Sequence, residues 1–133
     1  MIVLLTVKDL VARLYFTGFH CPVTYSALRR AMPLTAMAHR LGGILLLRLE
    51  LRGKAESHRA TLGLGEVAYW PPADALVVSL EQLVKMPSPV NPLGVVVEGL
   101  ELLRSLEECE EARAMLRLPE GEDVQWPSSQ PED

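Results

Sequence analysis

Two adjacent glycines, Gly42 and Gly43, constrain the fold of this 133-residue chain more than any other local feature. They separate two apolar runs, residues 34–41 and 44–51. Glycine enters left-handed backbone conformations without steric cost, and a two-residue turn of this kind joins antiparallel strands. We therefore expect a β-hairpin with both glycines at positive φ. From residue 47 to residue 52 leucine alternates with arginine or glutamate, which predicts a return strand with one buried face.

Short runs rich in β-branched and aromatic residues occupy much of the remaining chain. Two stretches have helical spacing instead: residues 23–32, where Thr24 is the expected N-cap and Pro33 ends the helix, and the stretch that follows Gly99. About eight short strands with two helices predict a mainly β domain built as a closed barrel. The further strands are expected at residues 2–7, 11–16, 66–70, 75–80, 95–97 and 112–118, with an extended connection at Pro71 and Pro72.

The composition indicates one globular domain with an uneven charge. Hydrophobic residues make up 49% of the chain and charged residues 23%, which is enough apolar material to bury a core. The net charge of −4 argues against nucleic acid as a partner. Residues 1–63 carry nine basic and three acidic side chains, whereas residues 64–133 carry four and fourteen. Opposite charges of this kind attract within a fold or between subunits of a homo-oligomer.

We expect the barrel domain to span residues 1–118 and an acidic, proline-containing tail to span 119–133, flexible or docked on a partner. The apolar start of the chain meets charge at Lys8, so we expect neither a signal peptide nor a membrane segment. The two cysteines lie 88 positions apart without metal-ligand spacing. This pattern is typical of idle thiols in a reducing compartment and favours a cytoplasmic location.

Two motifs carry a resemblance to a known family. The first is Gly-Glu-Val-Ala-Tyr-Trp-Pro-Pro at residues 65–72, and the second is Gly-Val-Val-Val-Glu-Gly-Leu at residues 94–100. Together they resemble small uncharacterised prokaryotic proteins with a cyclophilin-like fold. The resemblance implies a closed eight-stranded barrel with two capping helices. In those proteins an aromatic pair and a Thr-Pro step follow the strand after the prolines, whereas here that strand leads to Gln82.

The candidate ligand-binding residues are Tyr69, Trp70, Pro72, Arg40 and Gln82. The two aromatic side chains beside a rigid turn could stack against a small apolar ligand or a proline-containing peptide. The alternative is that Tyr69 and Trp70 point to opposite faces, one into the core and the other over a neighbouring loop. Packing is the commoner role of aromatic residues, and we weigh it above the ligand interpretation.

His39-Arg40 resembles the Phe-His-Arg of true cyclophilins, in which the arginine polarises a prolyl amide. Here Ala38 replaces the phenylalanine. Strand pairing places Arg40 on the inward face with Leu45, where its guanidinium must reach the barrel rim or find a carboxylate. We therefore favour a structural ion pair for Arg40 and a binding protein without isomerase activity. The alternatives are a peptidyl-prolyl isomerase and a non-catalytic subunit of an assembly that hydrolyses cyclic amides.

Other chemistry finds little support in the sequence. Gly63-x-Gly65-x-x-Ala68 fits a dinucleotide fingerprint, but the prolines that follow forbid the helix which that fingerprint needs. His20-Cys21 lacks a third group that would activate a nucleophile. The glutamates around Cys109 are expected to be solvated. We expect no cofactor and no metal.

Overall fold

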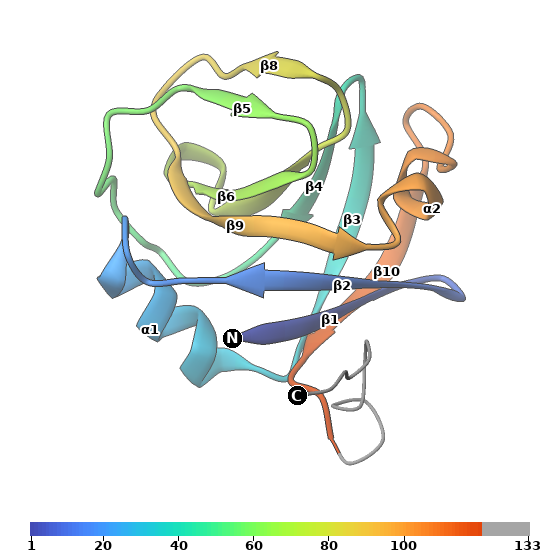
Figure 1. The fold of residues 1–133 in the computed structure, drawn as a ribbon, viewed down its shortest axis with the longest axis horizontal. Coiled ribbons are helices and arrows are strands. Elements are labelled where there is room, and N and C mark those ends of the chain that lie inside the picture. The colour runs from blue at the N-terminus through green and yellow to red at the C-terminus, as the bar shows by residue number, and fades with distance from the viewer. Residues whose placement is uncertain (121–133) are drawn as a thin grey trace, which may run out of the picture.

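The computed structural model describes residues 1–120 and shows a closed antiparallel barrel (Figure 1). Eight strands close it in the order β1-β10-β3-β4-β7-β6-β9-β2, which confirms the predicted mainly β barrel. The barrel strands are β1 (Ile2–Val7), β2 (Leu10–Phe16), β3 (Leu34–Leu41), β4 (Ile44–Arg48), β6 (Glu66–Trp70), β7 (Ala75–Ser79), β9 (Asn91–Glu98) and β10 (Glu111–Arg117).

Two helices and a small second sheet complete the described chain. Helix α1 (Pro22–Ala31) and the short helix α2 (Leu100–Arg104) lie on opposite sides of the barrel in Figure 1. The strands β5 (Thr61–Gly63) and β8 (Leu83–Lys85) pair with each other outside the barrel. Sequence patterns did not predict β5 and β8, because strands of three residues carry almost no periodicity.

The glycine hairpin is confirmed, with Leu41 opposite Ile44, but the two glycines play different roles. Gly42 has a φ of +57°, whereas Gly43 does not adopt positive φ, so the expectation of two left-handed residues was wrong. A Cβ on Gly43 would lie 2.7 Å from the side-chain carboxyl carbon of Glu81, so this glycine leaves room for a neighbouring side chain. The return strand β4 ends at Arg48, three residues earlier than the sequence pattern predicted.

The proline-rich connections also differ from expectation. Pro71–Ala73 form a turn of 3-10 helix, η1, rather than an extended link, and Asp74 ends it at a φ of +50°. Pro92 lies within β9, which begins at Asn91, four residues before the strand predicted at residues 95–97. The β6–β9 register shifts between Val67 and Ala68, at the pair Ala68–Pro92. A bulge tolerates a residue that has no N–H to donate.

Thr24 is not the N-cap of α1, as the sequence suggested. The cap is Cys21, whose side chain makes no capping bond, and Thr24 lies inside the first turn. The carboxylate of Glu56 instead accepts hydrogen bonds from the backbone N–H groups of Val23 and Thr24, at 3.1 and 2.8 Å. A distant acceptor therefore satisfies donors that a local cap would otherwise bind.

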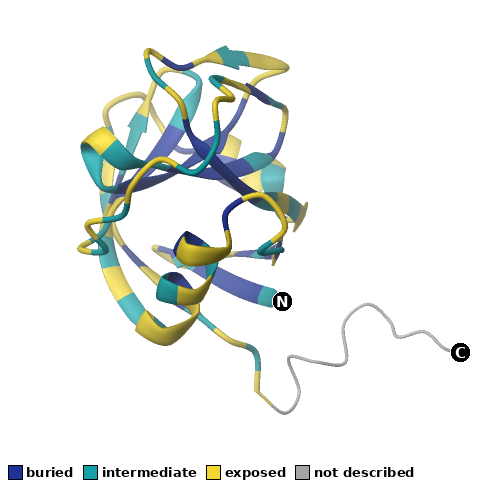
Figure 2. Ribbon diagram, turned by 90° about the vertical axis from the view of Figure 1, so that its left-hand side faces the viewer, coloured by how far each residue is buried: buried dark blue, intermediate teal, exposed yellow. Residues whose placement is uncertain are grey.

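The core has two parts, and Figure 2 shows the buried residues concentrated in the barrel strands. The larger cluster fills the barrel interior and includes Leu45, Tyr69 and Leu76. A second cluster lies between the barrel wall and the β5–β8 pair, where Leu62 and Met86 contribute to it. All five residues of β7 are consequently buried. The sequence of β7 is a nearly continuous apolar run, because both faces of the strand are covered.

No helix within residues 1–120 has the length and apolarity that a membrane span requires. Residues 121–133, which make up most of the predicted tail, lie outside the described residues. The boundary predicted at residue 118 comes directly after the end of β10 at Arg117.

Candidate functional site

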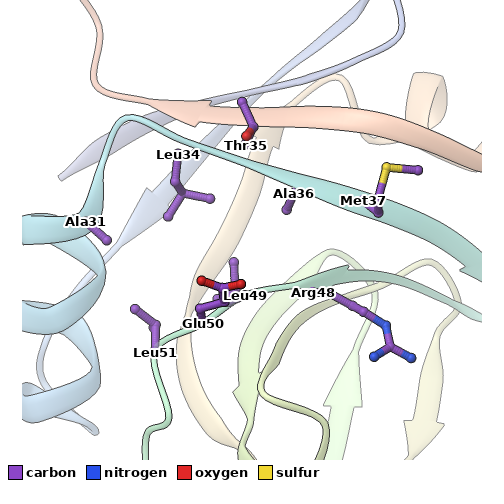
Figure 3. A pocket seen from close by; sticks show the side chains of 9 residues that line it. All are labelled: Ala31, Leu34, Thr35, Ala36, Met37, Arg48, Leu49, Glu50 and Leu51. Carbon is purple, nitrogen blue, oxygen red and sulfur yellow. The ribbon is translucent and has the colours of Figure 1, made fainter.

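The barrel opens beside the first half of β3. This strand pairs with β10 from Leu34 onward, but with β4 only from Ala38 to Leu41. Because β4 ends at Arg48, no described strand pairs with residues 34–37 on that side. A cleft of about 770 Å³ occupies the gap, and we call it the β3 cleft (Figure 3). Its lining residues are Ala31, Leu34, Thr35, Ala36, Met37, Arg48, Leu49, Glu50 and Leu51.

Residues 49–51 form the opposite wall of the cleft, and we call the segment of residues 49–53 the strap. Asp74 holds it through three hydrogen bonds. The backbone N–H of Leu49 donates to the Asp74 carbonyl at 2.8 Å. The N–H groups of Leu51 and Arg52 donate to the Asp74 Oδ1 at 3.2 and 3.1 Å. One residue in a left-handed turn thus fixes the distance between strap and barrel.

Tyr69 supports the same arrangement from inside the barrel. Its side chain is fully buried, and its hydroxyl donates to the Asp74 Oδ1 at 2.5 Å while it accepts from the Gly53 N–H at 2.9 Å. Burial, followed by the hydrogen bond to Asp74, raises the pKa of Tyr69 to about 12. The phenol therefore stays protonated, donates to Asp74 and accepts from Gly53 of the strap.

The cleft combines apolar walls with unused polar groups. Figure 3 shows Leu34 and Ala36 directed from β3 toward the strap residue Leu49. The exposed side chains of Arg48 and Glu50 form no hydrogen bond or ion pair with the described residues. The cleft can accordingly bury an apolar group and still offer polar contacts at its edge.

A second hollow lies on the other side of the strap, against α1. It has a volume of about 380 Å³, shares Leu51 with the β3 cleft, and is lined by Val23, Ala27 and Lys54 among others. Its wall is held by a network in which the Asn91 amide donates to the Thr24 hydroxyl at 3.0 Å and to the Lys54 carbonyl at 2.8 Å. The network ties α1, the loop after the strap and β9 together.

Glu56 is the charged member of this network. Besides two backbone N–H groups, its carboxylate accepts a hydrogen bond from the Thr24 hydroxyl at 2.5 Å. Burial alone would raise the pKa of Glu56, but the hydrogen bonds from Thr24 and Val23 outweigh that effect and lower it. Glu56 is therefore ionised at neutral pH and engaged with the helix, and it is not a free acid of the site.

The five predicted binding residues do not converge on one site. Tyr69 and Trp70 point to opposite faces, as the alternative interpretation held: Tyr69 lies in the barrel core, and half-buried Trp70 packs against the outer cluster. The Trp70 indole N–H donates to the Ser88 hydroxyl at 2.9 Å. Pro72 is exposed in η1.

Arg40 and Gln82 lie at the other end of the barrel. Trp70 pairs with Ala75 at the start of β7. Exposed Gln82 follows the other end of β7, where the Leu80 N–H donates to the Gly43 carbonyl in the turn that follows Arg40. A ligand at the aromatic motif would therefore be separated from both residues by the length of that strand. Binding roles for Trp70, Pro72, Arg40 and Gln82 stay predictions.

Arg40 faces inward at the rim, as strand pairing predicted, but it forms no ion pair among the described residues. Its guanidinium donates to the carbonyls of Arg104 and Leu106 at 3.1 and 2.7 Å and to that of Gly42 at 2.8 Å. The last carbonyls of a helix lack intrahelical partners, so Arg104 at the end of α2, with Leu106 just after it, supplies acceptors where a carboxylate was expected.

Among the other groups considered in the sequence, Cys21 is engaged within the fold. Cys21 is buried, its thiol donates to the Pro92 carbonyl at 3.0 Å, and burial, with Glu56 nearby, raises its pKa to about 12. A thiol of this kind is a poor nucleophile at neutral pH. No three histidine, cysteine or acidic side chains within residues 1–120 are grouped so that they could hold a metal.

The sequence did not indicate the β3 cleft. The leucine alternation at residues 47–52 looks like a strand that continues, and nothing local marks the point where it leaves β3. The one usable signal was Asp74, because an aspartate after two prolines is a residue that often accepts backbone hydrogen bonds in a turn.

Known proteins share this barrel architecture. The model of the family described as cyclophilin-like matches residues 1–115. The solution structure of the hypothetical protein AF2241 from Archaeoglobus fulgidus superposes with a TM-score of 0.72 at 20% identity, over 88% of this chain and 93% of that one.

A second solved structure, McbB in complex with tryptophan, gives a TM-score of 0.70 at 16% identity and covers 86% of this chain but 44% of McbB. No curated protein matches the sequence. Identities this low show a shared fold, whereas the family match extends over most of the chain and includes every strand of the barrel up to most of β10. The chain belongs to the cyclophilin-like family.

Proposed function

We propose that this protein binds a small apolar ligand or an extended peptide segment in the β3 cleft and does not itself carry out chemistry on it. The observation that carries the proposal is the free edge of β3 at residues 34–37, which faces a cleft with apolar walls. The cleft volume of about 770 Å³ falls within the usual range for small-molecule sites.

The backbone of β3 supports an extended occupant. An unpaired strand edge presents alternating N–H and C=O groups, which a peptide satisfies by adding a further strand. Inward-facing residues of such a strand, Leu34 and Ala36, are half-buried and leave room for apolar side chains of the ligand. Backbone bonds would then supply affinity and the cleft walls would select the side chains.

A solved structure of related fold suggests a chemical probe for the cleft. McbB, part of which shares this fold, has been solved in complex with tryptophan. The likeness covers less than half of McbB and concerns the fold alone. It supports testing an indole ring as a probe for this chain.

The geometry favours a binding role over isomerase activity. A rotamase needs a free donor that stabilises the twisted prolyl amide. The donors of Arg40 are engaged with three backbone carbonyls, and Ala38 stands where true cyclophilins have phenylalanine. A guanidinium held this way stabilises the rim of the barrel rather than a substrate.

The test is a titration of the full-length, ¹⁵N-labelled protein with indole and, separately, with a capped pentapeptide of alternating valine and threonine. We expect amide resonances of residues 34–37 and of the strap to shift most. Ala36→Leu, which fills the cleft, should weaken binding at least several-fold. Ala55→Leu is the matched control, because Ala55 is exposed and lines neither hollow. Shifts confined to the surroundings of Trp70, or equal binding by both variants, would contradict the proposal.

A further inference from the structure

Basic side chains line the β3 cleft and the two hollows beside it, and we call them the basic rim. Arg48 lines the cleft itself, and Arg113, opposite Met37 of β3, lines a neighbouring hollow with residues 35–37. Arg52 and Lys54 line the hollow on the other side of the strap. None of these four side chains forms an ion pair or hydrogen bond with another residue in the described part of the chain. Glu50 is the acidic residue of the cleft lining. The basic rim therefore carries a net positive charge, which Glu50 offsets only in part.

The chain leaves the barrel beside this rim. Leu116 pairs with Leu34, the first residue of β3, and β10 ends one residue later at Arg117. Neighbouring strands lie about 4.8 Å apart, so a strand added to the free edge of β3 would lie two spacings, roughly 10 Å, from β10. Three or four extended residues span that distance, at about 3.4 Å each.

The sequence beyond residue 120 has the chemistry that the cleft and its rim would accept. Residues 121–133 contain four acidic and no basic residues. Val124 and Trp126 are separated by one residue, so in an extended chain both side chains point to the same side. Pro127 follows directly and has no N–H for a ladder, which limits a paired segment to the residues before it.

We propose that residues 124–126 bind to the free edge of β3 as an added strand, with Val124 and Trp126 in the β3 cleft and Glu122 and Asp123 against the basic rim. The inference rests on the cleft being the binding site proposed above. It makes the end of the chain a built-in occupant that an incoming ligand must displace. The opposite charges of the two halves of the sequence then act within one molecule.

The experiment uses the full-length, ¹⁵N-labelled protein and its Trp126→Ala variant, with Ser128→Ala as the matched control in the same segment. Trp126→Ala should move the amide resonances of residues 34–37 and of the strap, and Ser128→Ala should leave them in place. Arg48→Glu and added salt should move the same resonances in the same direction as Trp126→Ala, because both weaken attraction at the rim. Changes confined to residues 121–133 in Trp126→Ala would overturn the inference.

Two further readouts separate the alternatives. Shifts that depend on protein concentration would mean that a second copy supplies the segment, which contradicts binding within one chain. Indole should bind Trp126→Ala several-fold more tightly than wild type, because its competitor is gone. Equal indole affinity refutes the built-in occupant and leaves the proposed function standing, whereas absence of indole binding at the cleft in both proteins refutes both.

Discussion

Replacing Tyr69 by phenylalanine removes one oxygen and leaves the buried ring in place. That oxygen makes two hydrogen bonds, one from the neutral Gly53 N–H and one to the Asp74 carboxylate. A neutral bond contributes about 1 kcal/mol and a bond to a charged group about 1.5 to 3 kcal/mol. Since the strap is partly open to water, we expect Tyr69→Phe to lower the free energy of unfolding by about 2 kcal/mol.

Urea denaturation and thermal melting check this value. For a domain of this size the loss corresponds to a fall in Tm of roughly 6 to 10 °C. Tyr25→Phe is the matched control, because the Tyr25 hydroxyl forms no hydrogen bond among residues 1–120 and the ring is half-buried; its stability should stay within about 0.5 kcal/mol of wild type. Tyr69→Phe should also speed hydrogen exchange at the strap. Unchanged stability and exchange would refute the conclusion that Tyr69 holds the strap.

Four further predictions follow from single contacts. Glu56→Gln should lower the free energy of unfolding by about 1 to 2 kcal/mol at neutral pH. Because the pKa of Glu56 is lowered in the folded protein, its contribution to stability is present above the unfolded pKa and is lost as pH falls through the folded pKa. The difference between the two proteins should therefore vanish in acid, which chemical denaturation across pH measures. The wild-type protein should lose stability between about pH 9 and pH 12, because there the Cys21 thiol ionises in the unfolded chain but stays protonated in the fold. Cys21→Ala should reduce this loss, and a similar loss in both proteins would argue against this explanation. Arg40→Ala should cost about 2 kcal/mol through its lost carbonyl bonds, and wild-type protein should isomerise a prolyl test peptide at the uncatalysed rate; catalysis that disappears in Arg40→Ala without loss of fold would contradict the binding role. Gly42→Ala should cost about 1 kcal/mol by forcing a left-handed alanine and Gly43→Ala clearly less, which comparative melting tests.

The barrel itself could be predicted from the sequence because its strands carry strong local signals. The Gly42 turn and the runs at residues 66–70 and 75–79 specify antiparallel neighbours that the structure confirms. Features that depend on distant partners could not be predicted. Two of the three acceptors of Arg40 are the carbonyls of Arg104 and Leu106, more than sixty residues away in the chain, and no spacing rule connects them with Arg40.

The candidate site was missed for the same reason. The Tyr69 motif attracted attention as a ligand surface, whereas its tyrosine and the following Asp74 turned out to hold the strap from behind. The alternation at residues 47–52 indicates which side chains are buried. It does not indicate where the segment stops pairing with β3. A period of two is shared by a paired strand and by an extended segment fastened through a single turn residue.

The attachment of the strap through a single turn residue affects how wide the β3 cleft can become. A wall of the cleft that belonged to a continuous ladder could move only if many barrel hydrogen bonds broke together. The strap is fastened to the barrel mainly through Asp74, so shifting it outward costs the few bonds that this residue makes and leaves the strand pairing intact. If ligands bind in the β3 cleft as proposed, the largest one is set by how far the strap moves outward. Substitutions at Asp74 would then widen selectivity without altering any residue that lines the cleft.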